Sequence, residues 1–409
     1  MMKPSLMMTA TALLTLAATA RALPTDAELT RALEDNPEWR MTQAESAVSD
    51  AEAGLKALSP HEWQTGGAFQ QRRSAASGTY GEWSWRLERG LRLPGKGRLD
   101  RDLATSLREQ AGLRAQAGQL GLKEEALGYW LDLAEAKARL ALIRRQTDAV
   151  RALAAKTETL VRSGEVSRRE LAQGQAELAR LQVREAEAVG QEAMAEETLA
   201  HHYPALRRIA DDRLPEPDAA PPEEAFLTDT LSGQPALRAA QAEVSGSRLA
   251  RERADAERRA DPVLGVFMSR ESNPREQAVG ISVSLPLGGE RRRQQAAEAQ
   301  ARQALAEARQ DVVRKSQEHA LDVLNGEIRA GQAVWSQAQA ARDRAAEAAS
   351  MAERAWQAGE GEMVEAVQAR RLALDAEETA LLAKVRLLRA QAMLRLRGEA
   401  ASAVGTTRP

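Results

Sequence analysis

The sequence of 409 residues contains no cysteine and few aromatic residues. The absence of cysteine excludes disulfide scaffolds, thiolate metal sites, cysteine nucleophiles and a lipid anchor on an N-terminal cysteine. Aromatic residues make up 3% of the chain and charged residues 28%, and alanine is the commonest residue. This composition is typical of long helices or coiled coils rather than of a thick globular core.

The chain also lacks a dominant charge and a long apolar run. With 57 Lys and Arg against 59 Asp and Glu, the net charge of −2 argues against a nucleic-acid binder. The apolar run from Leu6 to Ala20 is short for a spanning helix, which needs roughly 20 residues. Lys3 before it and Ala20-Arg21-Ala22 after it predict a secretory signal peptide over residues 1–22; the alternative is a retained anchor. Any later membrane span would have to be made of strands.

Proline is missing from two long spans, between Pro94 and Pro204 and between Pro286 and Pro409. Because proline costs a helix interior about 3 kcal/mol, each span favours long helices, and both carry coiled-coil-like apolar stripes. A helix over residues 96–161 would be about 100 Å long, which is more than a globular domain accommodates.

Each span has one break, at residues 162–167 and 357–362. A glycine followed by a serine or acidic helix start is typical of a turn between two helices. We therefore expect two helical hairpins, each with a long arm, a tip and a return helix; the alternative is a glycine tolerated within one helix. The residues predicted to form the tips are Gly164, Glu165, Gly359 and Gly361.

Two segments alternate between apolar and polar residues, which predicts a β-hairpin in each half of the chain. Strands with one apolar and one polar face suit a membrane barrel, although a soluble two-stranded ribbon has the same pattern. Polar positions such as Ser84, Arg86, Ser282 and Ser284 are expected to face the lumen. The positions predicted to face lipid are Trp63, Phe69, Trp83, Trp85, Leu87, Val263, Phe267, Ile281, Val283 and Leu285.

The mature sequence is an internal duplication. Asn36-Pro37 matches Gln234-Pro235, Leu93-Pro94-Gly95 matches Leu285-Pro286-Leu287, and Gly164 matches Gly359, at offsets of 198, 192 and 195. Offsets that differ only by small insertions and deletions over the whole mature chain indicate a repeated supersecondary unit. The predicted divisions are a signal peptide (1–22), a first repeat (23–203), a proline-rich connector (204–230), a second repeat (231–400) and a disordered tail (401–409).

Four strands cannot close a barrel, and open strand edges are not tolerated in lipid. If these strands span a membrane, several chains must share one barrel. The sequence therefore predicts an obligate oligomer.

The doubled plan resembles the TolC-like outer-membrane efflux protein family over residues 23 to 400. The motifs that carry the resemblance are Asn36-Pro37, Leu93-Pro94-Gly95-Lys96-Gly97, Leu285-Pro286-Leu287-Gly288 and the two tips, each with a glycine and then a Gln-Ala pair. Leu93-Pro94-Gly95-Lys96-Gly97 looks most like the outer components of heavy-metal efflux systems.

The resemblance implies a mainly α-helical fold with a small membrane β part. Three protomers would share a 12-stranded barrel in the outer membrane of a Gram-negative bacterium and form a periplasmic helical tunnel. The implied partners are two further copies of the chain, a periplasmic adaptor, an inner-membrane pump and outer-membrane lipid, with no nucleic acid. The tips would dock the adaptor.

The resemblance also points to a pore constriction after the second tip, where Glu360, Glu362 and Glu365 lie within six residues. Three chains would bring nine carboxylates near one axis, where charged rings set ion selectivity. The alternative is that these acids only stabilise a helix N-terminus. The first tip differs, because Glu165 is followed by Arg168 and Arg169.

No catalytic, cofactor or metal site emerges from the sequence, so we expect no enzyme activity. Gly95-Lys96-Gly97 lacks the upstream glycine and the following Ser or Thr of a phosphate loop. The adjacent His201 and His202 have no third metal ligand at a suitable spacing. The competing function is a non-channel periplasmic coiled-coil adaptor or scaffold, although adaptors usually carry one hairpin within β-rich domains.

Overall fold

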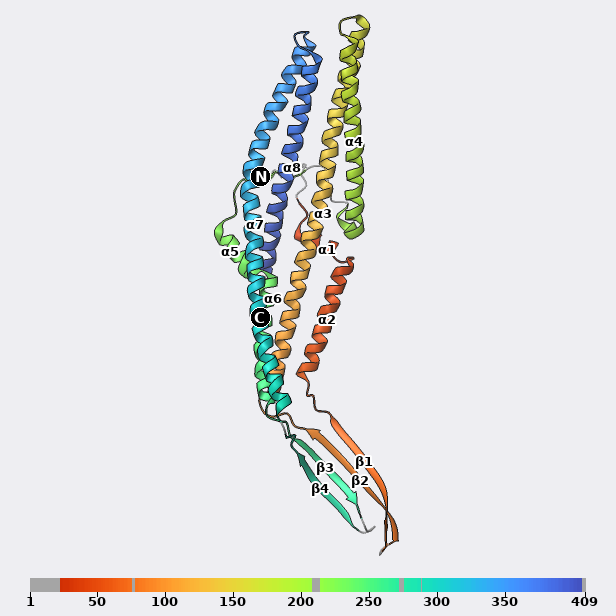
Figure 1. Cartoon of the computed structure of the whole chain (residues 1–409), viewed down its shortest axis with the longest axis vertical. Helices are drawn as coiled ribbons and strands as arrows, with labels where there is room; N and C mark the ends of the chain where they lie inside the picture. The colour runs from red at the N-terminus through yellow and green to blue at the C-terminus, as the bar shows by residue number, and fades with distance from the viewer. Residues whose placement is uncertain (1–22, 76–77, 208–213, 272–275, 288, 407–409) are drawn as a thin grey trace, which may run out of the picture. The chain divides into compact units, whose positions relative to one another are not determined.

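The structure is a computed structural model that describes residues 23–75, 78–207, 214–271, 276–287 and 289–406. The predicted signal peptide therefore lies outside the described residues. Within them the chain is mainly helical with one small sheet (Figure 1). The elements are α1 (Asp26–Ala32), α2 (Pro37–Ala57), β1 (Trp63–Ser74), β2 (Gly78–Gly90), α3 (Lys96–Ser163), α4 (Arg168–His202), the 3₁₀ turn η1 (Pro204–Leu206), α5 (Glu224–Gly233), α6 (Pro235–Glu257), β3 (Val263–Arg270), β4 (Gln277–Ser284), α7 (Glu290–Gln357) and α8 (Met363–Thr406).

The element order confirms the repeat of helix, β-hairpin, long arm, tip and return helix. The arms α3 and α7 each have 68 residues. The repeat also includes the short helices α1 and α5, whose first residues Asp26 and Glu224 differ by 198 positions. These helices were not predicted, because seven and ten residues show too little periodicity to be recognised.

The matching Asn-Pro and Gln-Pro pairs are helix starts. The Asn36 side chain accepts hydrogen bonds from the amides of Glu38 (2.8 Å) and Trp39 (3.2 Å), and Pro37 is the first residue of α2. Proline suits this position because the first helical amide has no partner within the helix. Pro235 is likewise the first residue of α6, although the Gln234 side chain makes no capping hydrogen bond.

The described residues divide into two compact units. One unit consists of residues up to 32, 126–219 and 330–392, and the other of residues 33–125, 220–329 and 393 onward. The long helices α3, α7 and α8 contribute residues to both. The sheet lies in the second unit, and the two hairpin tips lie in the first.

The sheet has the order β1-β2-β3-β4 with antiparallel neighbours. The two hairpins, one from each repeat, meet where β2 pairs with β3, so β1 and β4 are its edges. No described helix is long and apolar enough to cross a membrane.

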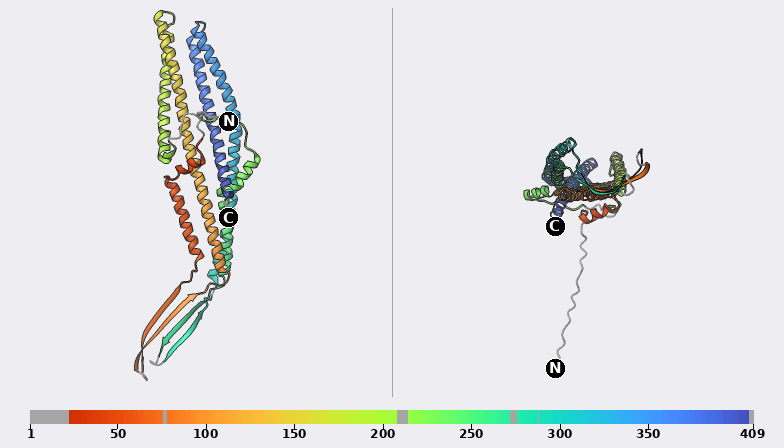
Figure 2. Two further views of the ribbon diagram at one scale, coloured as in Figure 1. Left: turned by 180° about the vertical axis from the view of Figure 1, so that it is seen from behind. Right: turned by 90° about the horizontal axis from the view of Figure 1, so that it is seen from below.

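In the unit with the tips, the hairpins α3–α4 and α7–α8 lie side by side (Figures 1 and 2). Small clusters of aliphatic side chains hold them together. One joins Leu142 and Val150 of α3, Leu181 of α4 and Leu374 of α8. This is packing along helix seams rather than around one thick core, as the composition predicted.

The helix α8 continues to Thr406, so the prediction of a disordered tail from residue 401 is wrong for residues 401–406. Ala401 is buried, and a Cβ placed on Gly233 at the end of α5 would lie 2.7 Å from the Ala401 carbonyl oxygen. The small alanines and the serine of this segment show little helical periodicity in the sequence. Packing against α5 stabilises the helix here. Residues 407–409 lie outside the described residues.

Candidate membrane-spanning sheet and hairpin tips

One face of the sheet is apolar and exposed across all four strands. The pairing register aligns residues of this face in four rows. A contiguous exposed apolar surface of this kind marks a membrane or protein contact, because water disfavours it. Its most exposed apolar side chains, each at least 39% accessible, are Trp63, Phe69, Trp85, Leu264, Val266, Met268, Val279, Ile281 and Val283.

Both ends of this apolar face carry aromatic and basic residues. At the end nearest the helices, Arg89 is paired opposite Trp63, and its guanidinium carbon lies 5.3 Å from the indole ring centroid. At the other end, Trp83 is paired with Phe69 on one side and with Arg270 on the other. Aromatic girdles beside charged residues are typical of the two edges of a membrane barrel.

The opposite face of the sheet is polar on β1, β2 and β4. Glu82 is buried there, where it accepts from Gln70 (2.5 Å) and pairs with Arg72 (2.9 Å). The predicted lumen residues Ser84, Arg86, Ser282 and Ser284 all lie on this face.

Two of the ten positions predicted to share the apolar face lie on the opposite one. Val263 is paired with Ser284, and the Phe267 ring covers Gly280, so both lie on the face that carries the serines. The prediction for Val263 and Phe267 is wrong because both parities of β3 are apolar, and the partner strands decide. Leu264, Val266 and Met268 take the apolar face instead. Leu285 follows the end of β4.

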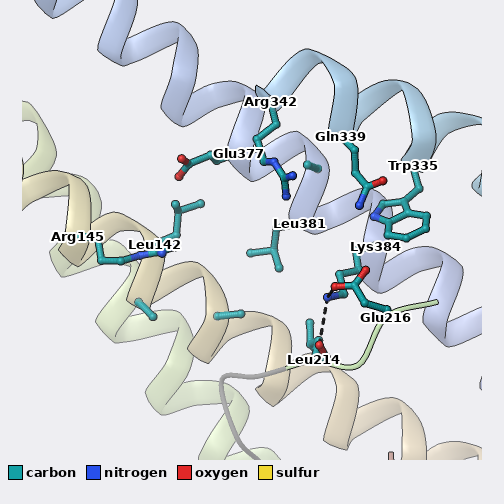
Figure 3. A pocket seen from close by; sticks show the side chains of 13 residues that line it. Leu142, Arg145, Leu214, Glu216, Trp335, Gln339, Arg342, Glu377, Leu381 and Lys384 are labelled. Carbon is teal, nitrogen blue, oxygen red and sulfur yellow. Dashed lines mark hydrogen bonds and ion pairs between the residues drawn. The ribbon is translucent and has the colours of Figure 1, made fainter. Parts of the chain in front are cut away.

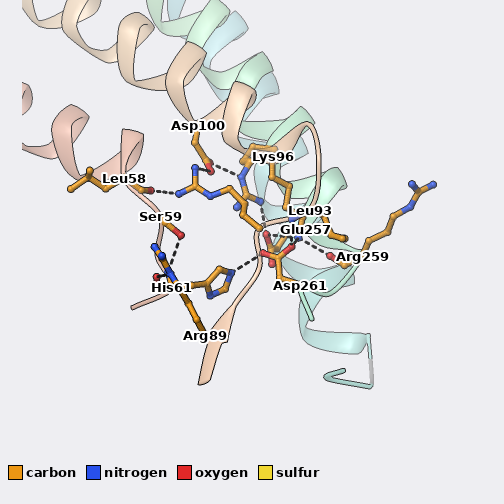
Figure 4. A network of polar contacts seen from close by, with 12 residues as sticks. Leu58, Ser59, His61, Arg89, Leu93, Lys96, Asp100, Glu257, Arg259 and Asp261 are labelled. Carbon is orange, nitrogen blue, oxygen red and sulfur yellow. Dashed lines mark hydrogen bonds and ion pairs between the residues drawn. The ribbon is translucent and has the colours of Figure 1, made fainter. Parts of the chain in front are cut away.

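Between the helices and the sheet, a buried polar network joins the two repeats (Figure 4). The Lys96 ammonium donates to the Asp261 carboxylate (2.8 Å) and to the Arg259 carbonyl (2.7 Å), and lies 3.2 Å from Glu257. His61 Nε2 lies 2.9 Å from the other Asp261 oxygen. The side chains of Lys96 and Asp261 are only 2% and 5% exposed, so each charge depends on the other.

The pKa of Asp261 reflects this environment. Burial alone would raise it, but hydrogen bonds from Lys96, His61 and the Leu93 amide outweigh burial and hold the pKa below its usual value. Lys96 stands between two glycines in the sequence, but its role could not be predicted because its partner Asp261 lies 165 residues away.

The two tips share one backbone design. Gly164 and Gly359 have φ values of 83° and 76°, in the left-handed region that favours glycine. After each glycine the next amide bonds back into the helix, from Glu165 to the Leu160 carbonyl (3.0 Å) and from Glu360 to the Ala355 carbonyl (2.9 Å). These are the C-terminal caps that the sequence predicted. A Cβ at either glycine would meet no other atom within 4 Å.

The acidic residues of the second tip are exposed: Glu360, Glu362 and Glu365. The Glu362 carbonyl accepts from the amides of Glu365 (3.1 Å) and Ala366 (3.4 Å), so Glu362 stands at the start of α8. Glu165 of the first tip is exposed as well, and Gly361 is half-buried. The proposed pore and docking roles of these residues remain predictions.

Behind the tips, an ion pair joins α8 to α4. Glu177 of α4 is buried between Arg180 (2.8 Å) and Arg371 of α8. Its burial would raise its pKa, but the hydrogen bonds from both arginines prevail and lower it. Met363 packs where a Cβ on Gly174 would lie, 2.5 Å from its methyl carbon, so the two hairpins approach closely here.

An open cavity of about 790 Å³ lies between α3, α7 and α8, beside the connector (Figure 3). Lys384 of α8 donates to the Leu214 carbonyl (3.1 Å) and the Glu216 carboxylate (2.7 Å) at its rim. Gln391 donates to the Asp218 carbonyl (2.8 Å) and accepts from the Asp218 amide. The cavity thus lies where the connector is hydrogen-bonded to α8.

No group of three His, Asp or Glu side chains in the described residues is arranged to hold a metal ion. His201 and His202 have ring centroids 4.9 Å apart, and His202 stacks on Tyr129.

We predict that Asp261→Asn destabilises the protein by about 3 kcal/mol, because it leaves a buried ammonium without its main carboxylate. The folded pKa of Asp261 lies below the unfolded value of about 3.9. Its contribution is therefore present above that unfolded value and is lost as pH falls through the folded pKa.

Thermal unfolding between neutral pH and pH ~3 would measure both effects. The difference in unfolding temperature between the wild type and Asp261→Asn should become smaller in acid. The exposed Asp255→Asn serves as the control. A gap that stays constant in acid would show that the Asp261 charge does not contribute.

No family model and no curated protein matches the sequence. The fold, however, is similar to solved outer-membrane proteins. It superimposes on the Vibrio cholerae outer membrane protein VceC with a TM-score of 0.71, at 17% identity over 91% of this chain and 95% of that one.

Two further solved structures have the same arrangement. For the Campylobacter jejuni CmeC outer membrane channel the TM-score is 0.66, at 14% identity over 92% of this chain and 85% of that one. For the open state of the Neisseria gonorrhoeae MtrE outer membrane channel the TM-score is 0.59, at 17% identity over 92% of this chain and 88% of that one. The resemblance that the sequence motifs indicated is confirmed at the level of the fold, which this chain shares with outer-membrane channels.

Proposed function

We propose that the chain is the outer-membrane channel of a tripartite efflux system. It would pass substrates from an inner-membrane pump and a periplasmic adaptor to the outside of a Gram-negative cell. The observation that carries the proposal is the exposed apolar face of the sheet, bounded at both ends by aromatic and basic residues and backed by a polar face. The fold shared with outer-membrane channels supports it.

The proposed assembly is a trimer with a 12-stranded barrel. Strands β1 and β4 are edges within the described chain, and a strand edge in lipid has no water to satisfy its amides and carbonyls. Pairing β4 of one copy with β1 of the next would remove every edge. Three copies of four strands give an even-stranded barrel within the known size range.

Unpartnered apolar stripes on the helices also support several copies. On α2, Met41, Val48 and Leu55 recur every seven residues and are 58%, 58% and 72% exposed. On α7, Leu305 and Val312 are 49% and 68% exposed. Stripes with seven-residue spacing pack against a partner helix, and in this proposal the partner belongs to the neighbouring copy.

The alternative is a periplasmic adaptor or scaffold without a pore. In a water-soluble ribbon, an apolar face across four strands would be unfavourable, because Ile281 and Val279 would be more than 70% exposed to water. Such a surface would promote aggregation in the periplasm. The channel function therefore fits the chain better.

The facing of the sheet provides the main test. Ile281→Arg should prevent assembly in the outer membrane, because an arginine on the lipid face costs about 2–4 kcal/mol near mid-membrane. The neighbouring Ser282→Arg lies on the polar face and should be tolerated. The measurement is the yield of heat-modifiable oligomer in the outer-membrane fraction. Equal yields of the two variants would contradict the membrane-spanning sheet.

The tips are the proposed docking points for the adaptor. Asparagine tolerates the left-handed conformation, so Gly164→Asn with Gly359→Asn should keep both turns while adding a side chain to each tip. We expect export to fall severely while the oligomer remains in the membrane. Gly190→Asn, in the exposed face of α4, is the matched control. Normal export, or a loss of oligomer in proportion to the loss of export, would leave the glycines a capping role only.

The second tip is the proposed gate. Replacing Glu362 and Glu365 with Gln should reduce cation selectivity and weaken block by multivalent cations, because a ring of carboxylates near the pore axis attracts cations. The measurement is the reversal potential of purified channels in a planar bilayer. Glu318→Gln with Glu327→Gln, at exposed positions near the middle of α7, removes the same charge elsewhere. If both pairs of variants behave alike, the acids of the tip act only on the helix start.

A further inference from the structure

The apolar face of the sheet ends, on the side nearest the helices, in a row suited to a membrane surface. The row runs across all four strands as Trp63, Arg89, Leu264 and Val283. Arg89 is placed over the Trp63 ring and donates to the His61 carbonyl (3.2 Å). Tryptophan and arginine side by side at the edge of an apolar face occupy the level where hydrocarbon gives way to lipid head groups.

Exposed leucines continue this surface beyond the strands. Leu58 precedes β1, and Leu285 and Leu287 follow β4; they are 65%, 55% and 90% exposed. These side chains gain little from water and fit the boundary between acyl chains and head groups.

Basic residues outnumber acidic ones in the segments that join the helices to the strands. Residues 58–63, 89–102, 251–263 and 284–293 contain twelve Lys or Arg and eight Asp or Glu. Three of those acids, Asp100, Glu257 and Asp261, are already paired with Lys96, Arg92 or Arg253. Pairing these three acids with three cations leaves the excess of positive charge outside this buried network.

Three exposed arginines carry much of that charge: Arg258, Arg259 and Arg291. Among the described residues none of their guanidinium groups has a hydrogen bond or ion pair. Figure 4 shows the Arg259 side chain directed away from the Lys96–Asp261 network. An unpaired guanidinium beside an exposed apolar surface is available for an external anion.

We propose that this junction surface binds the head groups of anionic phospholipids in the membrane leaflet next to the helices. The inference rests on the proposed membrane-spanning sheet. A guanidinium matches the oxygens of a phosphodiester in pairs, and clustered arginines near a membrane each add to the attraction for anionic lipid. The leucines and Trp63 would hold the acyl chains at the same level.

The test uses the full chain reconstituted in vesicles of phosphatidylcholine with trace spin-labelled phosphatidylglycerol or phosphatidylcholine. The wild type should prefer the phosphatidylglycerol label by at least about five-fold, the effect of one engaged arginine, and added salt should reduce the preference. Arg258→Gln, Arg259→Gln and Arg291→Gln together should bring the ratio close to one. The control Arg169→Gln, Arg314→Gln and Arg344→Gln removes the same charge from exposed helix positions and should keep it.

An unchanged preference in the junction variant, or an equal loss in the control, would overturn the inference. Insertion of the wild type with no preference for either label would also overturn it, while leaving the channel function intact. Failure to insert into the vesicles would overturn the inference and the membrane-spanning sheet together.

Discussion

The need to satisfy backbone amides and carbonyls at the two edges of the sheet constrains everything else in this protein. A sheet with exposed apolar side chains on one face is suited to lipid, but lipid offers nothing to an unpaired strand edge. Within the described residues, the sheet consists of strands β1 to β4 and both outer strands have an unpaired edge. The same chain carries exposed apolar stripes on α2 and α7, and in the proposed trimer neighbouring copies would cover these stripes and pair the strand edges.

Much of this fold could be predicted because its long helices and their turns are specified by local sequence patterns. Two proline-free spans became α3–α4 and α7–α8, and the tip glycines Gly164 and Gly359 proved to have positive φ. Breaks, caps and heptads act over a few residues, so the sequence displays them directly. Because the chain is duplicated, each motif occurs in both repeats, and the second occurrence strengthens a prediction that one weak motif could not support.

The failures share a different physical cause, which is that a distant partner decides the outcome. Val263 and Phe267 were assigned to the wrong face because β3 is apolar on both parities, and only its pairing with β2 and β4 separates them. The end of α8 was missed because its order comes from α5, whose Gly233 makes room for Ala401. The residues of the candidate gate and docking points lie at the tips as predicted, but their roles depend on other chains and stay predictions.

The ambiguity of β3 leads back to the buried network beside it. A slip of one residue would exchange its two faces, and both faces have apolar side chains to offer, so hydrophobic pattern alone specifies the register weakly. Asp261 lies two residues before the strand and accepts from the Leu93 amide (3.0 Å) and from Lys96, while the Leu91 amide donates to the Pro262 carbonyl (2.7 Å). A slipped strand would carry the carboxylate away from a lysine that is 2% exposed and leave that charge unpaired. Such a pair adds little net stability over an apolar one, but it penalises the wrong alignment heavily. We infer that Lys96 and Asp261, one from each repeat, align the two hairpins into a single sheet with one apolar face.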